Sequence, residues 1–149
     1  MTNKEFVLET MKRNGKATAQ ALQEKAENMT GTELYEESCY IPSFSAACAK
    51  KNMLDRPIGF VCRSSHGRVV KLLQPYDSTA YTAEPEELPA QWGFKWSQNA
   101  EHALPFVAIS TSPYMKGDCC TDGDVVYRST IDNNTWKPVD YPQGWEVVE

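Results

Sequence analysis

Residues 113–148 hold the groups best suited to chemistry: two adjacent cysteines, several aspartates beside glycines, and five tyrosine or tryptophan residues. A calcium-binding EF-hand register would begin at Asp118. It would place Cys120 where an oxygen ligand is needed and Ser129 where a bidentate glutamate belongs. An EF-hand loop also lies between two helices, whereas this stretch is rich in strand-forming residues. We therefore expect no calcium site.

The adjacent Cys119 and Cys120 point to opposite faces of a strand, so they cannot chelate one metal ion together. Asp122-Gly123 between two strand-prone runs is a hairpin signal, which supports a strand here. The chain has five cysteines, an odd number without a C-x-x-C pair, which argues against a disulfide framework and against a zinc site. We expect reduced thiols that pack as small apolar residues, in a reducing compartment, and no cofactor.

Groups for nucleophilic or acid–base catalysis are sparse. The two histidines are His66, in a predicted turn, and His102, in a predicted loop, and no G-x-S-x-G motif accompanies them. Cys62 is close to His66 in sequence, but no residue that would orient the imidazole is evident. A glycosidase needs a pair of carboxylates, and one acidic loop, which a solvated surface explains better, offers Glu84, Glu86 and Glu87. The sequence predicts a protein that is not an enzyme.

Aromatic residues are the remaining functional signal. Tyr114, Tyr127, Trp136, Tyr141 and Trp145 are more rings than so short a segment is expected to bury. An exposed ring face can stack on the C–H side of a sugar while neighbouring polar groups bond the hydroxyls. Tyr127 lies in the middle of a predicted strand and is expected in the core. Trp136, Tyr141 and Trp145 lie near loops after the hairpin and are the candidate ligand-binding residues.

Two short amphipathic helices are predicted within residues 1–28. Thr2 and Glu5 have capping-box spacing at the start of the first helix. The second helix runs from about Thr18 to Asn28 and has an apolar stripe of Ala19, Leu22, Ala26 and Met29. Because such a thin stripe cannot hold a short helix alone in water, we expect it to dock on its own domain or on a neighbouring subunit. A homo-oligomer is the prediction.

Further helices are predicted up to Pro57. Thr30 and Glu33 have capping-box spacing, and Pro42 suits the first turn of the helix that follows it. This helix should turn three side chains inward: Phe44, Ala47 and Cys48.

From Gly59 the pattern changes to strands. Residues 59–63 and 68–73 flank a four-residue connection that ends at Gly67, which predicts a hairpin. A strand around residues 92–96 would place alternate aromatic residues on one face, and residues 104–110 predict another strand. Helices first and strands afterwards, without alternation, indicate an α+β fold that ends in a small three-stranded antiparallel module.

A pattern of residues recurs in a known type of module: Tyr114-x-Lys116-Gly117-Asp118, a hairpin with Gly123, Tyr127-x-Ser129, Trp136-x-Pro138 and Gly144-Trp145-Glu146. It resembles the three-stranded carbohydrate-binding modules of the chitin-binding type. These occur at the ends of chitinases and as C-terminal segments of small tail-region proteins of bacteriophages and prophages of Gram-positive hosts. The ending resembles the phage version more closely. Chitinase-type modules carry an aromatic pair where this chain has Thr130 and Ile131, which moves the expected sugar contact to Trp136, Tyr141 and Trp145.

Charge and hydropathy exclude other classes of partner. Acidic residues outnumber basic ones by 20 to 15, the net charge is -5, and no Lys/Arg cluster exceeds two neighbours. A duplex-binding protein needs a concentrated cationic face, so nucleic acid is not expected as a partner. The N-terminus lacks the apolar region of a signal peptide, and no apolar run is long enough to span a bilayer, so no membrane association is expected.

The resemblance implies a non-enzymatic structural protein of a phage or prophage tail, baseplate or fibre. It would fold in the host cytoplasm, join the virion tail beside other virion proteins, and contact host surface polysaccharide for host recognition. Its segments would be a helical extension (1–28), an α+β body (29–112) and a carbohydrate-binding-like β-module (113–149). An intracellular tail-fibre assembly chaperone is the alternative, with aromatics that contact protein. A wall-binding accessory protein of a lytic system is the third possible function.

Overall fold

The computed structural model describes residues 19–148, so the predicted capping box at Thr2 and Glu5 lies outside the described residues. Residues 19–25 are helical. Two further α-helices follow, α2 (Gly31–Glu36) and α3 (Phe44–Lys50). The short 3-10 helices are η1 (Ala26–Asn28), η2 (Ser38–Tyr40), η3 (Met53–Asp55), η4 (Pro85–Glu87), η5 (Ala100–His102) and η6 (Pro142–Gly144). None of the helices in the described range combines the length and the apolar character that a membrane span requires.

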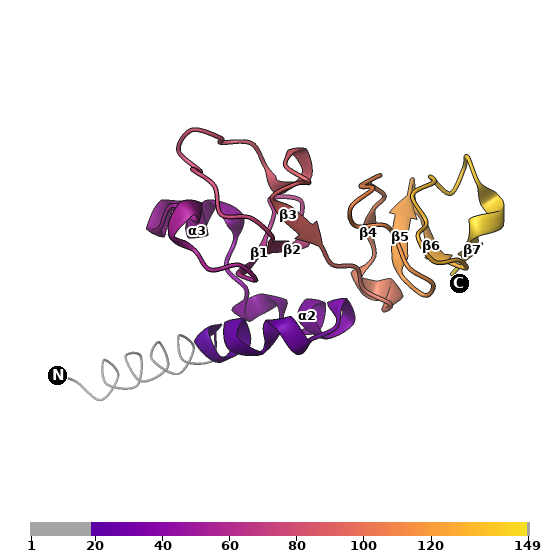
Figure 1. Ribbon diagram of the computed structural model, residues 1–149. Coiled ribbons are helices and arrows are strands. Elements are labelled where there is room, and N and C mark those ends of the chain that lie inside the picture. The colour runs from indigo at the N-terminus through magenta and orange to yellow at the C-terminus, as the bar shows by residue number, and fades with distance from the viewer. Residues whose placement is uncertain (1–18, 149) are drawn as a thin grey trace, which may run out of the picture.

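The strands form two sheets that lie side by side along the molecule (Figure 1). The first sheet is antiparallel in the order β1 (Val61–Arg63), β2 (Val69–Leu72), β3 (Trp92–Phe94). The second has the order β4 (Leu104–Pro105), β5 (Cys119–Asp122), β6 (Val125–Ser129), β7 (Trp145–Val147). Strands β5 to β7 are antiparallel, and β4 adds a short parallel strand beside β5. The fold class is α+β, as predicted.

Helix starts follow the capping residues. The capping box of α2 is confirmed: Glu33 N donates to Thr30 Oγ1 at 3.2 Å, and Thr30 N donates to Glu33 Oε1 at 3.1 Å. The predicted place of Pro42 in the first turn of α3 is wrong, because Ser43 is the N-cap residue and accepts from Ala46 N at 3.2 Å. A serine hydroxyl can satisfy a free amide of the first turn, whereas a proline side chain has no acceptor.

The predicted inward face of α3 is confirmed. Phe44 and Ala47 are buried, and the half-buried Cys48 packs against the same cluster.

The first sheet is covered on both faces, which explains why its strands are apolar at nearly every position. Val61 and Val69 face a smaller core that also contains Leu22, Ala26, Leu34, Tyr35 and Ile41. The alternate residues face a larger core that includes Cys62, Val70, Leu72, Trp92, Phe94 and Phe44. The predicted hairpin between β1 and β2 is confirmed, and Gly67 has a φ of +82°.

The apolar stripe before residue 29 packs on the protein's own sheet. Leu22 and Ala26 are buried in the smaller core, and Met29 packs against it. The Gln23 side chain bonds the outer edge of β1 twice: Nε2 donates to Val61 O at 2.7 Å, and Val61 N donates to Oε1 at 2.9 Å. An uncovered edge strand invites pairing with other chains, so this contact closes one edge of the sheet. The homo-oligomer stays a prediction.

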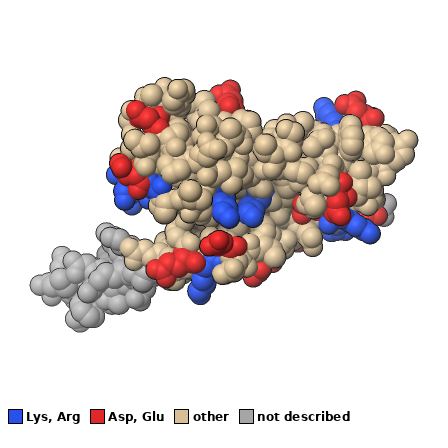
Figure 2. Space-filling model, in the orientation of Figure 1, with Lys and Arg blue, Asp and Glu red and all other residues tan. Residues whose placement is uncertain are grey.

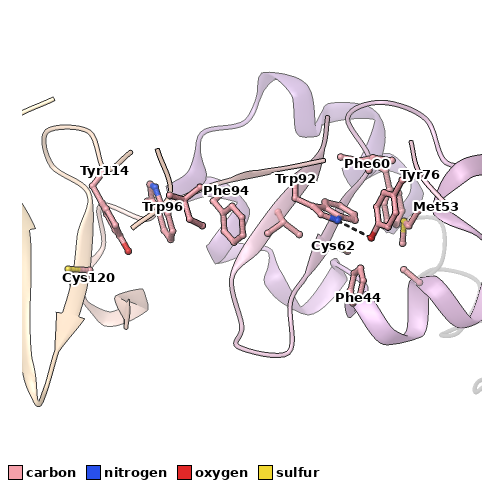
Figure 3. Packing of buried hydrophobic residues seen from close by; sticks show 14 of the residues in the cluster. Phe44, Met53, Phe60, Cys62, Tyr76, Trp92, Phe94, Trp96, Tyr114 and Cys120 are labelled. Atoms are coloured by element: carbon pink, nitrogen blue, oxygen red, sulfur yellow. Dashed lines mark hydrogen bonds between the residues drawn. The ribbon is translucent and has the colours of Figure 1, made fainter. Parts of the chain in front are cut away.

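The predicted aromatic face of residues 92–96 is confirmed and joins the two sheets. Trp92, Phe94 and Trp96 are all buried in the larger core. Figure 3 shows Phe94, Trp96 and Tyr114 in a row that leads from the first sheet toward Cys120 of β5. The rings of Trp96 and Tyr114 stack with their centroids 4.2 Å apart. One hydrophobic cluster therefore crosses the predicted segment boundary at residue 112.

The second sheet differs from expectation in two details. The hairpin loop is Gly123-Asp124, one residue later than predicted, with Asp122 paired to Val125 and a φ of +63° at Gly123. The strand predicted for residues 104–110 is only Leu104–Pro105. The chain leaves the sheet afterwards because Phe106 and Ile109 turn toward the larger core.

Candidate functional site

The candidate site is the loop that connects β6 to β7, residues 130–144. Its centre is Asn134, which is completely buried. The Asn134 backbone exchanges two hydrogen bonds with Tyr114, at 2.8 and 2.9 Å. Its side-chain Nδ2 donates to Ser129 Oγ at 3.0 Å and to Gly144 O at 2.9 Å. Since one amide thus ties both ends of the loop to the strands, the loop has a fixed shape.

Two aromatic rings stand on the outside of this loop. Trp136 is 50% exposed and Tyr141 is 36% exposed. Their ring centroids lie 5.2 Å apart, with the planes tilted by 47°. The two rings therefore form one exposed aromatic surface, named here the Trp136–Tyr141 pair.

The backbone beneath the pair is held by hydrogen bonds. Trp136 N donates to Asn134 Oδ1 at 3.2 Å, and Trp136 O accepts from Trp145 Nε1 at 2.8 Å. The Tyr141 ring lies against Gly144, where an added Cβ would come within 2.8 Å of Tyr141 Cδ2. Only glycine leaves room for the ring at this point. The Trp136 backbone and the position of the Tyr141 ring are thus set by contacts within the protein.

Trp145 does not share this exposure, and the expectation that it stands clear of the core is wrong. Its side chain belongs to the larger core and is only 6% exposed. Its ring meets Phe106 and Tyr114 edge to face, at centroid distances of 6.1 and 5.3 Å. Both partners come from the chain before β5, and Phe106 lies outside the predicted module at 113–149. Trp145 supports Trp136 from below instead of presenting a ring face.

The other two aromatic residues of the segment are also accounted for. Tyr114 is buried between Trp96 and Phe106, which stack on it at 4.2 and 5.5 Å. Tyr127 is half-buried and packs against the larger core, as predicted for a ring in mid-strand. Of the five rings, only those of the Trp136–Tyr141 pair are exposed.

Polar residues lie in the same loop as the exposed pair. Lys137 Nζ lies 3.8 Å from the Oδ1 atom of Asp122, the last residue of β5. Asp122 Oδ2 is buried and has no hydrogen-bond partner among the described residues. Asp140 and Gln143 are exposed in the same loop. The loop therefore carries exposed aromatic rings together with exposed donors and acceptors.

The adjacent cysteines of β5 lack the properties of nucleophiles. Cys119 and Cys120 lie on opposite faces of β5, as predicted, with Cys120 in the larger core and Cys119 Sγ near Gln98 O at 3.6 Å. Burial raises the pKa of the Cys120 thiol to about 12, and burial also raises the pKa of Cys119. A thiol in this state holds its proton at neutral pH and is a poor nucleophile.

The acidic loop has a structural function. Glu86 Oε1 lies 3.0 Å from Arg68 Nη1 and accepts from Ser64 Oγ at 2.6 Å. Glu84 Oε1 accepts from Ser65 N at 2.7 Å. These bonds tie the loop to the β1–β2 hairpin. Arg68 Nη2 also donates to Pro105 O at 2.7 Å, which links this hairpin to β4.

Within residues 19–148, no group of three or more His, Cys, Asp and Glu side chains is arranged to hold a metal ion. On the face shown in Figure 2, acidic and basic side chains are interspersed, and no broad area of one sign is visible.

No protein-family model matches the chain, and searches of curated proteins and of solved structures find no match either.

Proposed function

We propose that the protein is a non-enzymatic glycan-binding component of a phage or prophage tail, and that the Trp136–Tyr141 pair contacts the sugar. The observation that carries this proposal is the exposure of two adjacent aromatic rings, 5.2 Å apart, in a loop that the buried Asn134 ties to the strands. The resemblance of residues 114–146 to carbohydrate-binding modules supports the choice of a glycan and of a tail protein.

The geometry suits sugar rings in two ways. The flat faces of Trp136 and Tyr141 offer C–H contact, and Lys137 and Asp140 lie in the same loop to bond hydroxyl groups. The hydrogen bonds at the Trp136 backbone and the fixed position of Tyr141 reduce the ordering that binding requires.

Binding of the purified full chain to chitin and to Gram-positive cell-wall polysaccharide tests the proposal. We expect Trp136→Ala and Tyr141→Ala each to weaken binding roughly tenfold or more, the loss of about 1–3 kcal/mol expected for a stacking ring. The melting temperature should change little, because an exposed ring contributes little to stability. Tyr81→Ala is the matched control, since Tyr81 is 61% exposed but lies outside the site.

Absence of binding to both materials by a well-folded wild type would contradict the proposal. So would equal weakening by Tyr81→Ala and Trp136→Ala.

A protein-binding factor, such as a tail-fibre assembly chaperone, is the second candidate. It is favoured by Val139, which is 61% exposed in the same loop and has no polar group for a sugar. Mass spectrometry of purified particles separates the two functions. A stoichiometric component of the particle supports the tail protein, and absence from finished particles supports the chaperone.

A further inference from the structure

A pocket with a volume of about 650 Å³ lies in the N-terminal half, away from the Trp136–Tyr141 pair. Its walls come from the helix at residues 19–25, from the η2 region, from α3 and from the chain between Arg56 and Arg63. The apolar part of the lining includes Ile41, Ala46 and Phe60. The volume is in the range of small-molecule sites in proteins, about 300–1,000 Å³.

The charged side chains that line this pocket all have one sign. They are Lys50, Arg56 and Arg63, and no Asp or Glu is among the described lining residues. None of the three forms an ion pair within residues 19–148, where the ion pairs are Arg68–Glu86 and Lys137–Asp122. The whole chain has a net charge of -5, so the positive charge at the pocket is opposite in sign to the net charge of the protein. A local cationic excess of this kind attracts anions.

Contacts within the protein hold the guanidinium groups of Arg56 and Arg63 in place, and each group keeps N–H donors without a partner in the described part of the chain. Arg56 Cζ lies 4.3 Å from the centre of the Phe60 ring, and Arg56 Nη2 donates to Ala47 O at 2.9 Å. Arg56 Nε is buried and has no partner in the described part of the chain. Arg63 Nε donates to Ile41 O at 2.9 Å. A guanidinium has five N–H donors, so each group keeps donors for an anionic ligand.

We propose that this pocket binds a small amphipathic anion. Its apolar body contacts Ile41, Ala46 and Phe60, and its carboxylate, phosphate or sulfonate group lies among Lys50, Arg56 and Arg63. The site is independent of glycan binding, since it shares no residue with the loop at 130–144.

Fluorescence titration with two probes of the same shape tests the proposal. Anilinonaphthalenesulfonate has the anionic group, and phenylnaphthylamine is its uncharged counterpart. We expect the wild-type chain to bind the anionic probe at least fivefold more tightly, with a difference that shrinks as salt is added. Lys50→Gln should weaken binding of the anionic probe roughly threefold and leave the neutral probe unchanged. Lys51→Gln is the matched control, because the exposed Lys51 is next in sequence and does not line the pocket.

A second pair of variants locates the probe without removing charge. Ala46→Trp should fill the pocket and reduce binding of both probes at least tenfold, whereas Ala49→Trp should not. Ala46 and Ala49 are both exposed residues of α3, and only Ala46 lines the pocket. The proposal is overturned if the two probes bind equally, if Lys50→Gln and Lys51→Gln act alike, or if Ala46→Trp leaves binding intact. It is also overturned if Trp136→Ala abolishes probe binding, which would place the probe at the other site.

Discussion

Aromatic side chains of the same kinds lie in opposite environments in the first sheet and in the loop between β6 and β7. Trp92, Phe94 and Trp96, in and after β3, are all buried, because helices and loops cover both faces of the first sheet. Trp136 and Tyr141 extend from the second sheet in a loop that no other described part of the chain covers, and both are exposed. Whether a second layer packs over a ring decides its exposure here, and the residue type does not.

The sheet edges differ in the same way. The outer edge of β1 is closed by the Gln23 side chain and by Pro42, whose carbonyl accepts from Arg63 N at 2.9 Å. The outer edge of β7 has no strand partner among residues 19–148. Its Glu146 and Val147 are exposed. The outer edge of the first sheet is thus covered, whereas the outer edge of the second is not paired within residues 19–148.

The largest effect is expected from the tryptophan beneath the exposed pair. Trp145→Ala removes a ring from the larger core and the hydrogen bond to Trp136 O, and it should cost about 3–5 kcal/mol of unfolding free energy. Trp136→Ala should cost about 0.5 kcal/mol or less. Denaturant unfolding measures both values. Equal losses would show that the two rings share one environment, against the structure.

A smaller loss is expected from the residue that ties the loop together. Asn134→Ala leaves Gly144 O and the Ser129 hydroxyl without their buried donor, which should cost about 3 kcal/mol. The neighbouring Asn133 is exposed and has a φ of +55°, which glycine adopts readily, so Asn133→Gly is the control and should be nearly neutral. Thermal melting that ranks the two variants the other way would contradict the central position of Asn134.

The smallest effect is expected at the covered edge of the first sheet. Gln23→Ala removes two hydrogen bonds to Val61, but water can reach this partly buried edge, so the loss should be about 1 kcal/mol. Gln20→Ala, one turn away, is the control. Light scattering of the same variants checks the edge itself. If Gln23 protects β1, self-association should rise in Gln23→Ala and not in Gln20→Ala.

Local patterns predicted much of the fold. The period of two in residues 92–96, the glycine that ends the β1–β2 connection and the capping box at Thr30 each specify structure through near neighbours. All three predictions are confirmed, because residues close in the sequence determine these structures. The start of α3 was predicted too early because Pro42 suits a first turn, whereas the hydroxyl of Ser43 accepts the Ala46 amide and begins the helix at Phe44.

The parts that could not be predicted depend on long-range contacts. Trp145 is buried by Phe106 and Tyr114, which precede it by more than thirty residues. Asn134 lies in a polar stretch typical of an exposed loop, and its burial follows from pairing with Tyr114. Lys50, Arg56 and Arg63 are spread along the chain and form no sequence cluster. A search for basic runs therefore misses the pocket that they line.

The four tryptophans give the most direct test that the Trp136–Tyr141 pair is the binding surface. Three indole N–H groups have a fixed acceptor: that of Trp92 donates to Tyr76, that of Trp96 to Ser112 and that of Trp145 to Trp136 O. The fourth belongs to the exposed Trp136. In a nitrogen–proton NMR titration with soluble fragments of cell-wall polysaccharide or chitin, the Trp136 indole signal should shift most. Trp145 should respond weakly through its bond to Trp136, and the signals of Trp92 and Trp96 should stay in place. A shift of Trp92 or Trp96 with Trp136 unchanged, or no shift at any indole, would contradict the account.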